Sequence, residues 1–208
     1  ILADANKKVL MNRLLIGDVG SGKTIVAILA MIVFAKNGYQ AAMMVPTEVL
    51  AIQQYEKNLS LIEGFDLKFA LLTGSSKNKD AIKAKLNNGE IDIVIGTHAL
   101  IQEDVSFKDL RFVVNDEQHR FGVGQRQALG QKGTKVNYLT MTATPIPRTI
   151  SIRISKILDL SMINELPKGR KPITTKIVSE VMEKALFDQI NHNLQAGRQV
   201  YVVSNNID

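Results

Sequence analysis

Short runs of apolar and β-branched residues alternate along this chain with stretches of helical periodicity. This alternation is typical of βαβ units, in which helices cover both faces of a parallel sheet. We expect strands at 13–17, 40–45, 67–72, 91–96, 110–116 and 135–141, and helices at 22–36, 48–59, 78–87 and 123–130. Several of these strands are almost wholly apolar, as expected where both faces are buried. The fold class is therefore α/β, and functional loops should follow the carboxyl ends of the strands.

Residues 167–173 contain two prolines and a glycine, a composition that predicts a linker. It separates a first lobe, residues 1–166, from residues 174–208. In the latter we expect a strand at 174–178, a helix at 180–196 and a strand at 199–203. A single βαβ unit is too small to bury its own core. We therefore interpret 174–208 as the incomplete beginning of a second, similar lobe, and the chain, which starts at Ile1, as a piece of a longer protein.

The composition limits the classes of partner. Lysine and arginine number 26 against 20 acidic residues, and this basic excess is compatible with a polyanionic partner such as nucleic acid. The chain has no cysteine, which excludes disulfides and thiolate metal sites and fits the reducing cytoplasm. No apolar run approaches the roughly 20 residues of a membrane span, so we expect no membrane partner.

A glycine-rich segment between the first predicted strand and helix fits the pattern G-x-x-x-x-G-K-[ST]. Its glycines allow backbone N–H groups to turn inward around an anion, and the following helix directs its positive end at the same point. The Lys23 ammonium would reach the β- and γ-phosphates of ATP, and the Thr24 hydroxyl would hold Mg²⁺. The alternative is a chance glycine turn. We predict an ATP-binding loop made of Gly17, Asp18, Val19, Gly20, Ser21, Gly22, Lys23 and Thr24.

The predicted strand 110–116 delivers two adjacent carboxylates at its carboxyl end. Asp116 is suited to the Mg²⁺ shell, and Glu117 to orienting and deprotonating an attacking water. An isolated Asp-Glu pair is usually a solvated turn, but the phosphate loop favours the catalytic interpretation. His119 has no second histidine or cysteine at metal-ligand spacing. Its place three residues after Asp116 favours a sensor near the γ-phosphate, although a lone histidine is more often a surface or core residue.

The phosphate loop together with Asp116-Glu117-Gln118-His119 resembles the DExH box of superfamily-two helicases. Three further segments resemble helicase motifs Ia, Ib and III in the right order: Val45-Pro46-Thr47-Glu48, Gly96-Thr97-His98-Ala99-Leu100 and Thr142-Ala143-Thr144-Pro145. Five longer segments resemble the corresponding segments of RecG-type branched-DNA helicases: MNRLLIGDVGSGKT, VPTEVLA, GTHALI, DEQHRFGVGQR and MTATPIPRT. Transcription-repair coupling translocases are similar throughout, but they more usually have glutamate at the position of Gln118.

This resemblance implies a RecA-like, ATP-dependent helicase lobe that uses ATP and Mg²⁺ to remodel branched or forked DNA in recombination and repair. It implies a monomeric parent protein with a second lobe and a DNA-reading wedge domain, so the chain alone should hydrolyse ATP weakly. Two alternatives remain open: a nucleotide-gated binding module, and a motor acting on RNA. Pro46, Thr47, Thr97 and His98 would face DNA, Thr142 and Thr144 would couple it to the nucleotide, and Arg148 would contact a phosphate or the second lobe. For any of these threonines alone, helix capping is the ordinary interpretation.

Overall fold

The computed structural model describes residues 1–5, 7, 9–116, 128–144, 158–165, 173–175, 177 and 183–203. The chain divides into two units, Ile1–Lys168 and Gly169–Asp208, each of which is described by itself.

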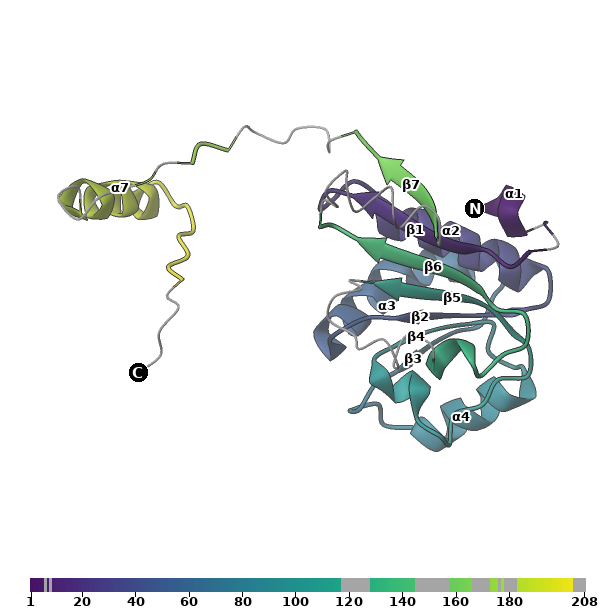
Figure 1. The fold of residues 1–208 in the computed structure, drawn as a ribbon. Helices are drawn as coiled ribbons and strands as arrows, with labels where there is room; N and C mark the ends of the chain where they lie inside the picture. Colours follow the sequence, from purple (N-terminus) through teal and green to yellow (C-terminus); the bar gives the residue numbers. More distant parts are fainter. Residues whose placement is uncertain are drawn as a thin grey trace. The chain divides into compact units, whose positions relative to one another are not determined.

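The first unit is built on a seven-stranded parallel sheet (Figure 1). Its strands are β1 (Asn12–Gly17), β2 (Gln40–Met44), β3 (Phe69–Leu72), β4 (Ile93–Gly96), β5 (Leu110–Asp116), β6 (Asn137–Thr142) and β7 (Asp159–Ile163). They are arranged in the order β3-β4-β2-β5-β6-β1-β7. The parallel sheet expected from the sequence is confirmed, and each of the six predicted strands is present with ends that differ by at most two residues. The seventh strand, β7, was not predicted.

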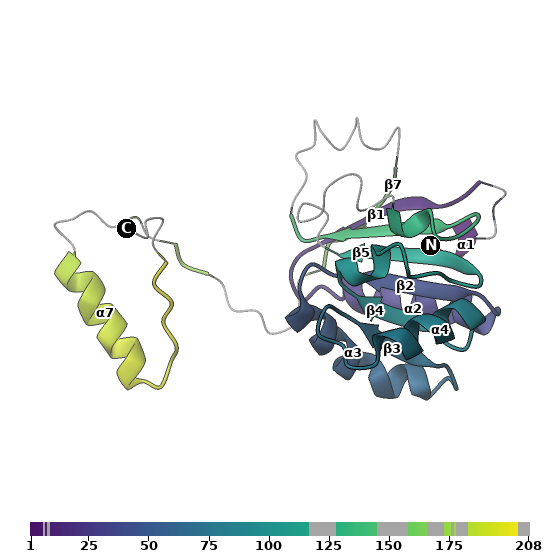
Figure 2. The same ribbon diagram turned by 90° about the horizontal axis from the view of Figure 1, so that it is seen from below.

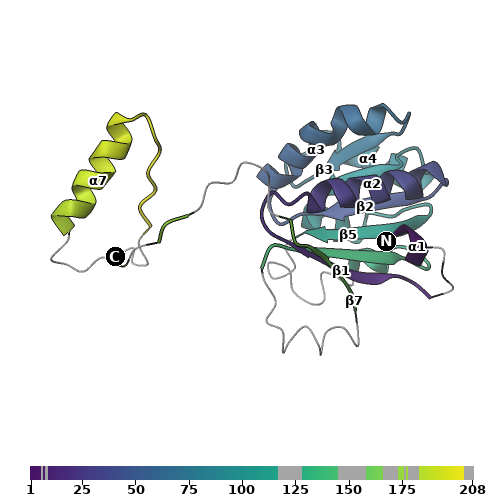
Figure 3. The same cartoon turned by 90° about the horizontal axis from the view of Figure 1, so that it is seen from above.

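Helices cover both faces of this sheet (Figures 2 and 3). On one face α2 (Lys23–Lys36) and α3 (Glu48–Glu63) pack against the strands, and Phe34 of α2 stacks on Phe112 of β5 with ring centroids 4.6 Å apart. On the other face lie α4 (Lys79–Asn88) and the short 3₁₀-helix η1 (His98–Ile101). A four-residue helix, α1 (Leu2–Ala5), precedes β1. Every residue of β2 and β4 is buried, which confirms strands covered on both faces.

The start of β2 shows how a polar residue is accommodated in this core. Gln40 is buried, and its side-chain amide donates to the carbonyls of Leu86 and Ile91 at 2.9 and 2.8 Å. Its side-chain carbonyl accepts the N–H of Asp109 at 3.1 Å. Because all these groups are paired, Gln40 joins α4 to the segments that precede β4 and β5 without the cost of an unsatisfied buried amide.

The described part of the second unit contains one helix, α7 (Glu183–Gln195), within the predicted range 180–196. The strand predicted at 199–203 is absent, because a strand requires a hydrogen-bonded neighbour and the described residues of this unit supply none. The unit exposes many large apolar side chains: Ile173, Ile177, Leu186, Phe187, Leu194, Tyr201, Val202 and Val203. The interpretation of this unit as the start of a second lobe remains a prediction.

Two further expectations can be compared with the described residues only. Of the predicted helix 123–130 only residues 128–130 are described, and these three are helical. Within the described ranges, none of the helices is both long and apolar enough to cross a bilayer.

Candidate nucleotide site

Strand β1 leads directly into the predicted phosphate loop (residues 17–24), and α2 begins at Lys23. The loop turns tightly through two glycines in the left-handed region, Gly20 with φ 79° and Gly22 with φ 94°. Residues with a Cβ rarely adopt these angles. At Gly17 the constraint is space, since a Cβ there would lie 2.5 Å from Ser21 Oγ. The glycines of the sequence pattern therefore stand where the backbone requires them.

The loop leaves polar groups available for an anion. The residue before α2 is Gly22, which has no side chain that could accept a hydrogen bond from the first N–H groups of the helix. The Oγ of Ser21 is buried and has no partner among the described residues. Lys23 Nζ donates to the loop's own carbonyls, at 2.7 Å to Gly17 and 2.9 Å to Asp18. An ammonium, a helix amino terminus and a buried hydroxyl together make a site suited to phosphate.

Two cavities adjoin the loop. One, of about 230 Å³, is lined by Gly20, Gly22, Lys23, Thr24, Ile25, Lys57 and Asn58. The other, of about 360 Å³, is lined by Ile16, Gly17, Asp18, Ala143, Met162, Ile163 and Asn164. Lys57 of α3 lines the first cavity together with Lys23 and Thr24, so a second lysine adjoins the predicted phosphate position.

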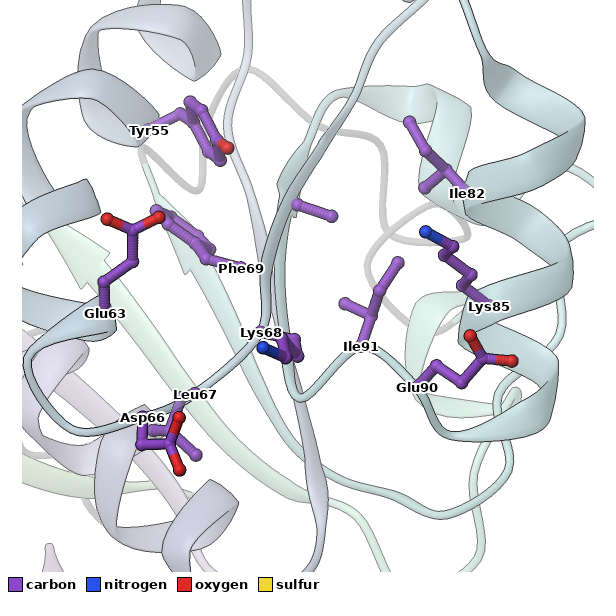
Figure 4. Close-up of a pocket in the computed structure, with 11 residues that line it drawn as sticks. Tyr55, Glu63, Asp66, Leu67, Lys68, Phe69, Ile82, Lys85, Glu90 and Ile91 are labelled. Atoms are coloured by element: carbon purple, nitrogen blue, oxygen red, sulfur yellow. The ribbon is translucent and has the colours of Figure 1, made fainter.

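A larger cavity of about 810 Å³ lies elsewhere (Figure 4). Its lining comes from the start of β3, the segment before β4, and α3 and α4, with Tyr55, Phe69 and Ile82 among the apolar side chains. In a parallel sheet these strand starts are at the edge opposite the phosphate loop, and ligands of such sheets bind at the carboxyl ends. Its size therefore does not make it the nucleotide site.

The acidic strand end is close to the phosphate loop in the order of the sheet. Asp116 is the last residue of β5 and is half-buried. It lies beside Met141 of β6, which in turn lies beside Leu15 of β1, so one strand separates the carboxylate from the strand that carries Gly17. Glu117 and His119 lie outside the described residues, and their predicted roles stay predictions.

The donor set fits the magnesium ion that the resemblance implies. Among the described residues no three histidine, cysteine or carboxylate side chains form a cluster that would hold a metal by themselves. Mg²⁺ bound with a nucleotide does not need such a cluster, because it uses one or two carboxylates together with phosphate oxygens and waters. The Thr24 hydroxyl at the start of α2 and the Asp116 carboxylate at the end of β5 are ligands of the right kind.

The residues expected to face DNA differ in exposure. Thr47 is exposed, but its hydroxyl accepts the N–H of Leu50 at 3.3 Å and so caps α3, which is the ordinary role considered above. Pro46 is half-buried and His98 is exposed at the start of η1. The side chain of Thr97 is only 1% exposed, and its Oγ1 has no partner in the described structure. A direct contact between DNA and this hydroxyl would require the loop to move.

The two threonines predicted to couple the sites are joined to each other. Thr142 ends β6, and its Oγ1 lies 3.1 Å from Thr144 Oγ1 and accepts the Thr144 N–H at 3.1 Å. These bonds form a compact turn at the carboxyl end of β6, the strand between β1 and β5. Arg148 lies outside the described residues.

Strand β7 is the site element that sequence reasoning missed. Its last residue, Ile163, pairs with Gly17, and a Cβ on Gly17 would lie 3.2 Å from the Ile163 Cβ. Arg13 of β1 holds β7 through hydrogen bonds to the Leu160 carbonyl at 3.2 Å and to Ser161 Oγ at 2.8 Å. The alternation of apolar and polar residues over Asp159–Ile163 was the available signal, but it is short and includes a charge.

A strand–glycine loop–helix unit with its lysine and threonine, with an acidic strand end one strand away in the same parallel sheet, defines a P-loop nucleotide-binding lobe. The chain belongs to the DEAD/DEAH box helicase family, whose model matches residues 2–152.

Similar proteins narrow the comparison to RecG. The chain is 48% identical over 207 residues to the ATP-dependent DNA helicase RecG of Aquifex aeolicus (strain VF5), covering 98% of this chain and 26% of that protein. It is 51% identical over 206 residues to RecG of Staphylococcus aureus (strain NCTC 8325), covering 98% and 30%. The predicted resemblance to RecG-type helicases is thereby confirmed. The chain spans less than a third of the length of these relatives.

Solved structures agree. The structure of RecG bound to a three-way DNA junction matches with a TM-score of 0.80 and 44% identity, covering 94% of this chain and 26% of that one. The helicase domain of Pyrococcus furiosus Hef matches with a TM-score of 0.54 and 22% identity, covering 74% and 36%, and at that identity supports the fold alone.

Proposed function

We propose that this chain is the ATP-binding motor lobe of a RecG-type DNA helicase, which uses Mg-ATP hydrolysis to remodel branched DNA. The observation that carries the proposal is the phosphate loop. Its Ser21 hydroxyl and α2 amino terminus have polar groups without side-chain partners, and its lysine is held by carbonyls that a phosphate would replace. A loop stabilised for its own sake would satisfy these groups internally.

ATP binding would change the partners of a few named groups. The Lys23 ammonium would leave the carbonyls of Gly17 and Asp18 for phosphate oxygens, and the loop N–H groups would donate to the same anion. Thr24 and Asp116 would hold Mg²⁺, which supplies neutralisation of the phosphate charge. Glu117 would orient the attacking water and accept its proton, and His119 would contact the γ-phosphate region.

The proposed DNA face is formed by the loops after β2 and β4, with Pro46, Thr47, Thr97 and His98. These loops emerge at the same edge of the sheet as the phosphate loop, because every strand is parallel. Hydroxyl and backbone N–H groups that contact phosphates set the register on DNA without reading its sequence. A net charge of +6 supports a polyanionic partner. The bonded pair Thr142 and Thr144, with Arg148 nearby in sequence, would couple this face to the nucleotide.

The proposal that branched DNA is the substrate is based on the similar proteins. The solved RecG that is 44% identical to this chain is described as bound to a three-way DNA junction. The two relatives at 48% and 51% identity are both RecG proteins, which favours this class over the transcription-repair coupling translocases. The wedge domain, a monomeric state, action on DNA rather than RNA and a cytoplasmic location belong to the same proposal.

A second lobe is required to complete the engine. The apolar side chains exposed along α7, Leu186, Phe187 and Leu194, favour a unit that packs against further elements of a longer protein. Arginine fingers in general accelerate phosphoryl transfer by about 10³–10⁵, and we expect the second lobe to supply such an arginine. Without that second lobe the nucleotide site would be incomplete. This favours a second candidate function for the chain alone, a nucleotide-gated DNA-binding module with little turnover.

The test is Mg-ATP hydrolysis by this chain, with and without forked DNA, beside its Lys23→Ala variant. We expect ATP to bind, Lys23→Ala to weaken that binding by about 100-fold, and turnover to stay near background. Brisk hydrolysis that DNA stimulates and Lys23→Ala abolishes would contradict the two-lobe account. In the longer protein, Glu117→Gln should trap ATP without turnover, and normal ATPase activity of that variant would remove Glu117 from the mechanism.

A further inference from the structure

Outside the phosphate loop, the carboxylate of Glu48 connects the start of α3 to the turn that follows β3. Glu48, the first residue of α3, accepts the N–H of Ser75 at 3.0 Å and the hydroxyl of Ser75 at 2.7 Å. A Cβ on Gly74 would lie 2.7 Å from Glu48 Oε1, so a glycine at this position allows the carboxylate to approach. The start of α3 is thereby attached to the turn that follows β3, which spans residues 73–76.

Turn 73–76 is internally bonded. The Thr73 N–H donates to Ser76 Oγ at 2.9 Å, and Ser76 Oγ donates to the Leu71 carbonyl at 3.3 Å. The Thr73 hydroxyl lies 3.2 Å from each of the Ser75 and Ser76 hydroxyls. These hydroxyls therefore hold the turn together and make it a firm anchor for the carboxylate.

Pro46 and Thr47 directly precede the anchored residue. On their other side Val45 donates its N–H to the Gly96 carbonyl at 2.9 Å, so the sheet fixes one end of this short loop. Glu48 fixes the other end, and Thr47 caps the same helix. The hydrogen bonds from Ser75 lower the pKa of Glu48, because they favour the ionised form of the carboxylate.

A negative charge beside DNA phosphates opposes binding by electrostatics alone. Its presence next to Pro46 and Thr47 therefore calls for another reason. We propose that Glu48 is a positioning residue: it anchors the start of α3 to turn 73–76 and so holds Pro46 and Thr47 in the orientation that contact with DNA phosphates requires. This inference rests on the proposed function of that face.

The first test compares two glutamates of the same helix. Glu48→Gln removes the charge and weakens the bonds to Ser75, whereas Glu56→Gln removes the same charge from an exposed position. Binding of a fluorescein-labelled forked DNA is followed by anisotropy at low salt. We expect Glu48→Gln to bind about fivefold more weakly, the loss of a charge-assisted hydrogen bond at an exposed site. Glu56→Gln should bind as tightly as the parent chain or slightly more tightly.

Ser75→Ala tests the same contact without any change of charge. It should weaken DNA binding by a smaller factor, and the double variant Glu48→Gln/Ser75→Ala should bind no more weakly than Glu48→Gln, because both changes break one contact. The melting temperature of each variant shows whether it is folded, and Ser75→Ala carries the test if Glu48→Gln is not.

Hydrogen exchange in the absence of DNA separates this proposal from the proposed function. Exchange of the Leu50 N–H, which Thr47 caps, should be faster in Glu48→Gln and Ser75→Ala and unchanged in Glu56→Gln. If the parent chain binds no forked DNA while this pattern holds, the DNA-binding function fails and the anchoring of the loop stands. Unchanged Leu50 exchange, or tighter DNA binding by Glu48→Gln than by the parent chain, would overturn the positioning role.

Discussion

Two turns at the carboxyl ends of strands have similar residue compositions but differ in whether their polar groups are hydrogen-bonded within the protein. The phosphate loop after β1 and turn 73–76 after β3 each connect a strand to a helix and contain glycine and serine. In each case the first residue of the helix is a lysine that donates to a carbonyl of the turn. In the phosphate loop the Ser21 hydroxyl is buried without a partner among the described residues. In turn 73–76 the hydroxyls are bonded, and the Glu48 carboxylate accepts the Ser75 N–H.

The difference shows what makes a turn a phosphate site. In turn 73–76 a carboxylate of the protein already accepts from the serine N–H and hydroxyl, as a phosphate would in the loop after β1. Composition alone does not distinguish them, whereas the presence or absence of internal partners does. The comparison predicts opposite responses to matched substitutions in the two turns.

The largest expected difference concerns the two lysines. Lys23→Ala should weaken binding of Mg-ATP by about 100-fold, because it removes the ammonium nearest the predicted phosphates. Lys79→Ala, the matched change at the other turn, should leave nucleotide affinity unchanged. Titration with a fluorescent ATP analogue measures both dissociation constants. Equal losses in the two variants would show that charge in general, and not the loop, binds the nucleotide.

The glycines give the next difference. Gly17→Ala would place a Cβ 2.5 Å from Ser21 Oγ, and Gly74→Ala would place one 2.7 Å from Glu48 Oε1. Both variants should melt at a lower temperature than the parent chain. Only Gly17→Ala should also weaken ATP binding, by about tenfold, because it distorts the loop that holds the phosphates. A tenfold loss in Gly74→Ala would remove the distinction between the turns.

Two serines should change stability in opposite directions. Ser21→Ala removes a buried hydroxyl without a partner and should stabilise the nucleotide-free chain by up to about 1 kcal/mol. Ser76→Ala removes the acceptor of the buried Thr73 N–H and should destabilise it by about 1–2 kcal/mol. Urea unfolding followed by circular dichroism compares the two free energies. Destabilisation by Ser21→Ala would mean that this hydroxyl has a structural role.

The smallest effect depends on pH. The pKa of Glu48 lies below its usual value of 4.5 because Ser75 donates to the carboxylate. A lowered pKa contributes stability that is complete above the pKa of the unfolded chain and disappears as the pH falls through the folded pKa. The melting temperatures of the parent chain and Glu48→Gln should therefore differ slightly at pH 7 and converge well below pH 4.5. A difference that persists unchanged at low pH would exclude the ionised carboxylate as its cause.

The turn geometry of the phosphate loop was predictable because it depends on consecutive residues, whereas the binding of ATP by this loop stays a prediction. Gly17 to Thr24 are consecutive, and the backbone angles that the pattern requires belong to the glycines themselves. Strands such as β5 were equally clear, since their apolar runs are continuous. The carboxylate of Asp116 followed from its place at the end of that strand.

Features that depend on distant residues were not predictable. The hydrogen bond between Glu48 and Ser75 joins residues 27 positions apart, and neither segment has a sequence pattern that predicts contact with the other. Burial of the Thr97 hydroxyl is a property of the packed fold, although its sequence suggested a DNA contact. Strand β7 was missed because its pattern is short, and the strand expected at 199–203 was wrong because a β-pattern forms no strand without a neighbour.

The pairing of β7 with β1 has a mechanical consequence. Ile163 lies beside Gly17, and from Ile163 the chain runs on toward the second unit within a few residues. Because hydrogen-bonded neighbouring strands move together, a displacement of Gly17 would also displace Ile163 at the end of β7. In the proposed motor, β7 would therefore be the strand through which a displacement of the phosphate loop passes directly to the residues that precede the second unit.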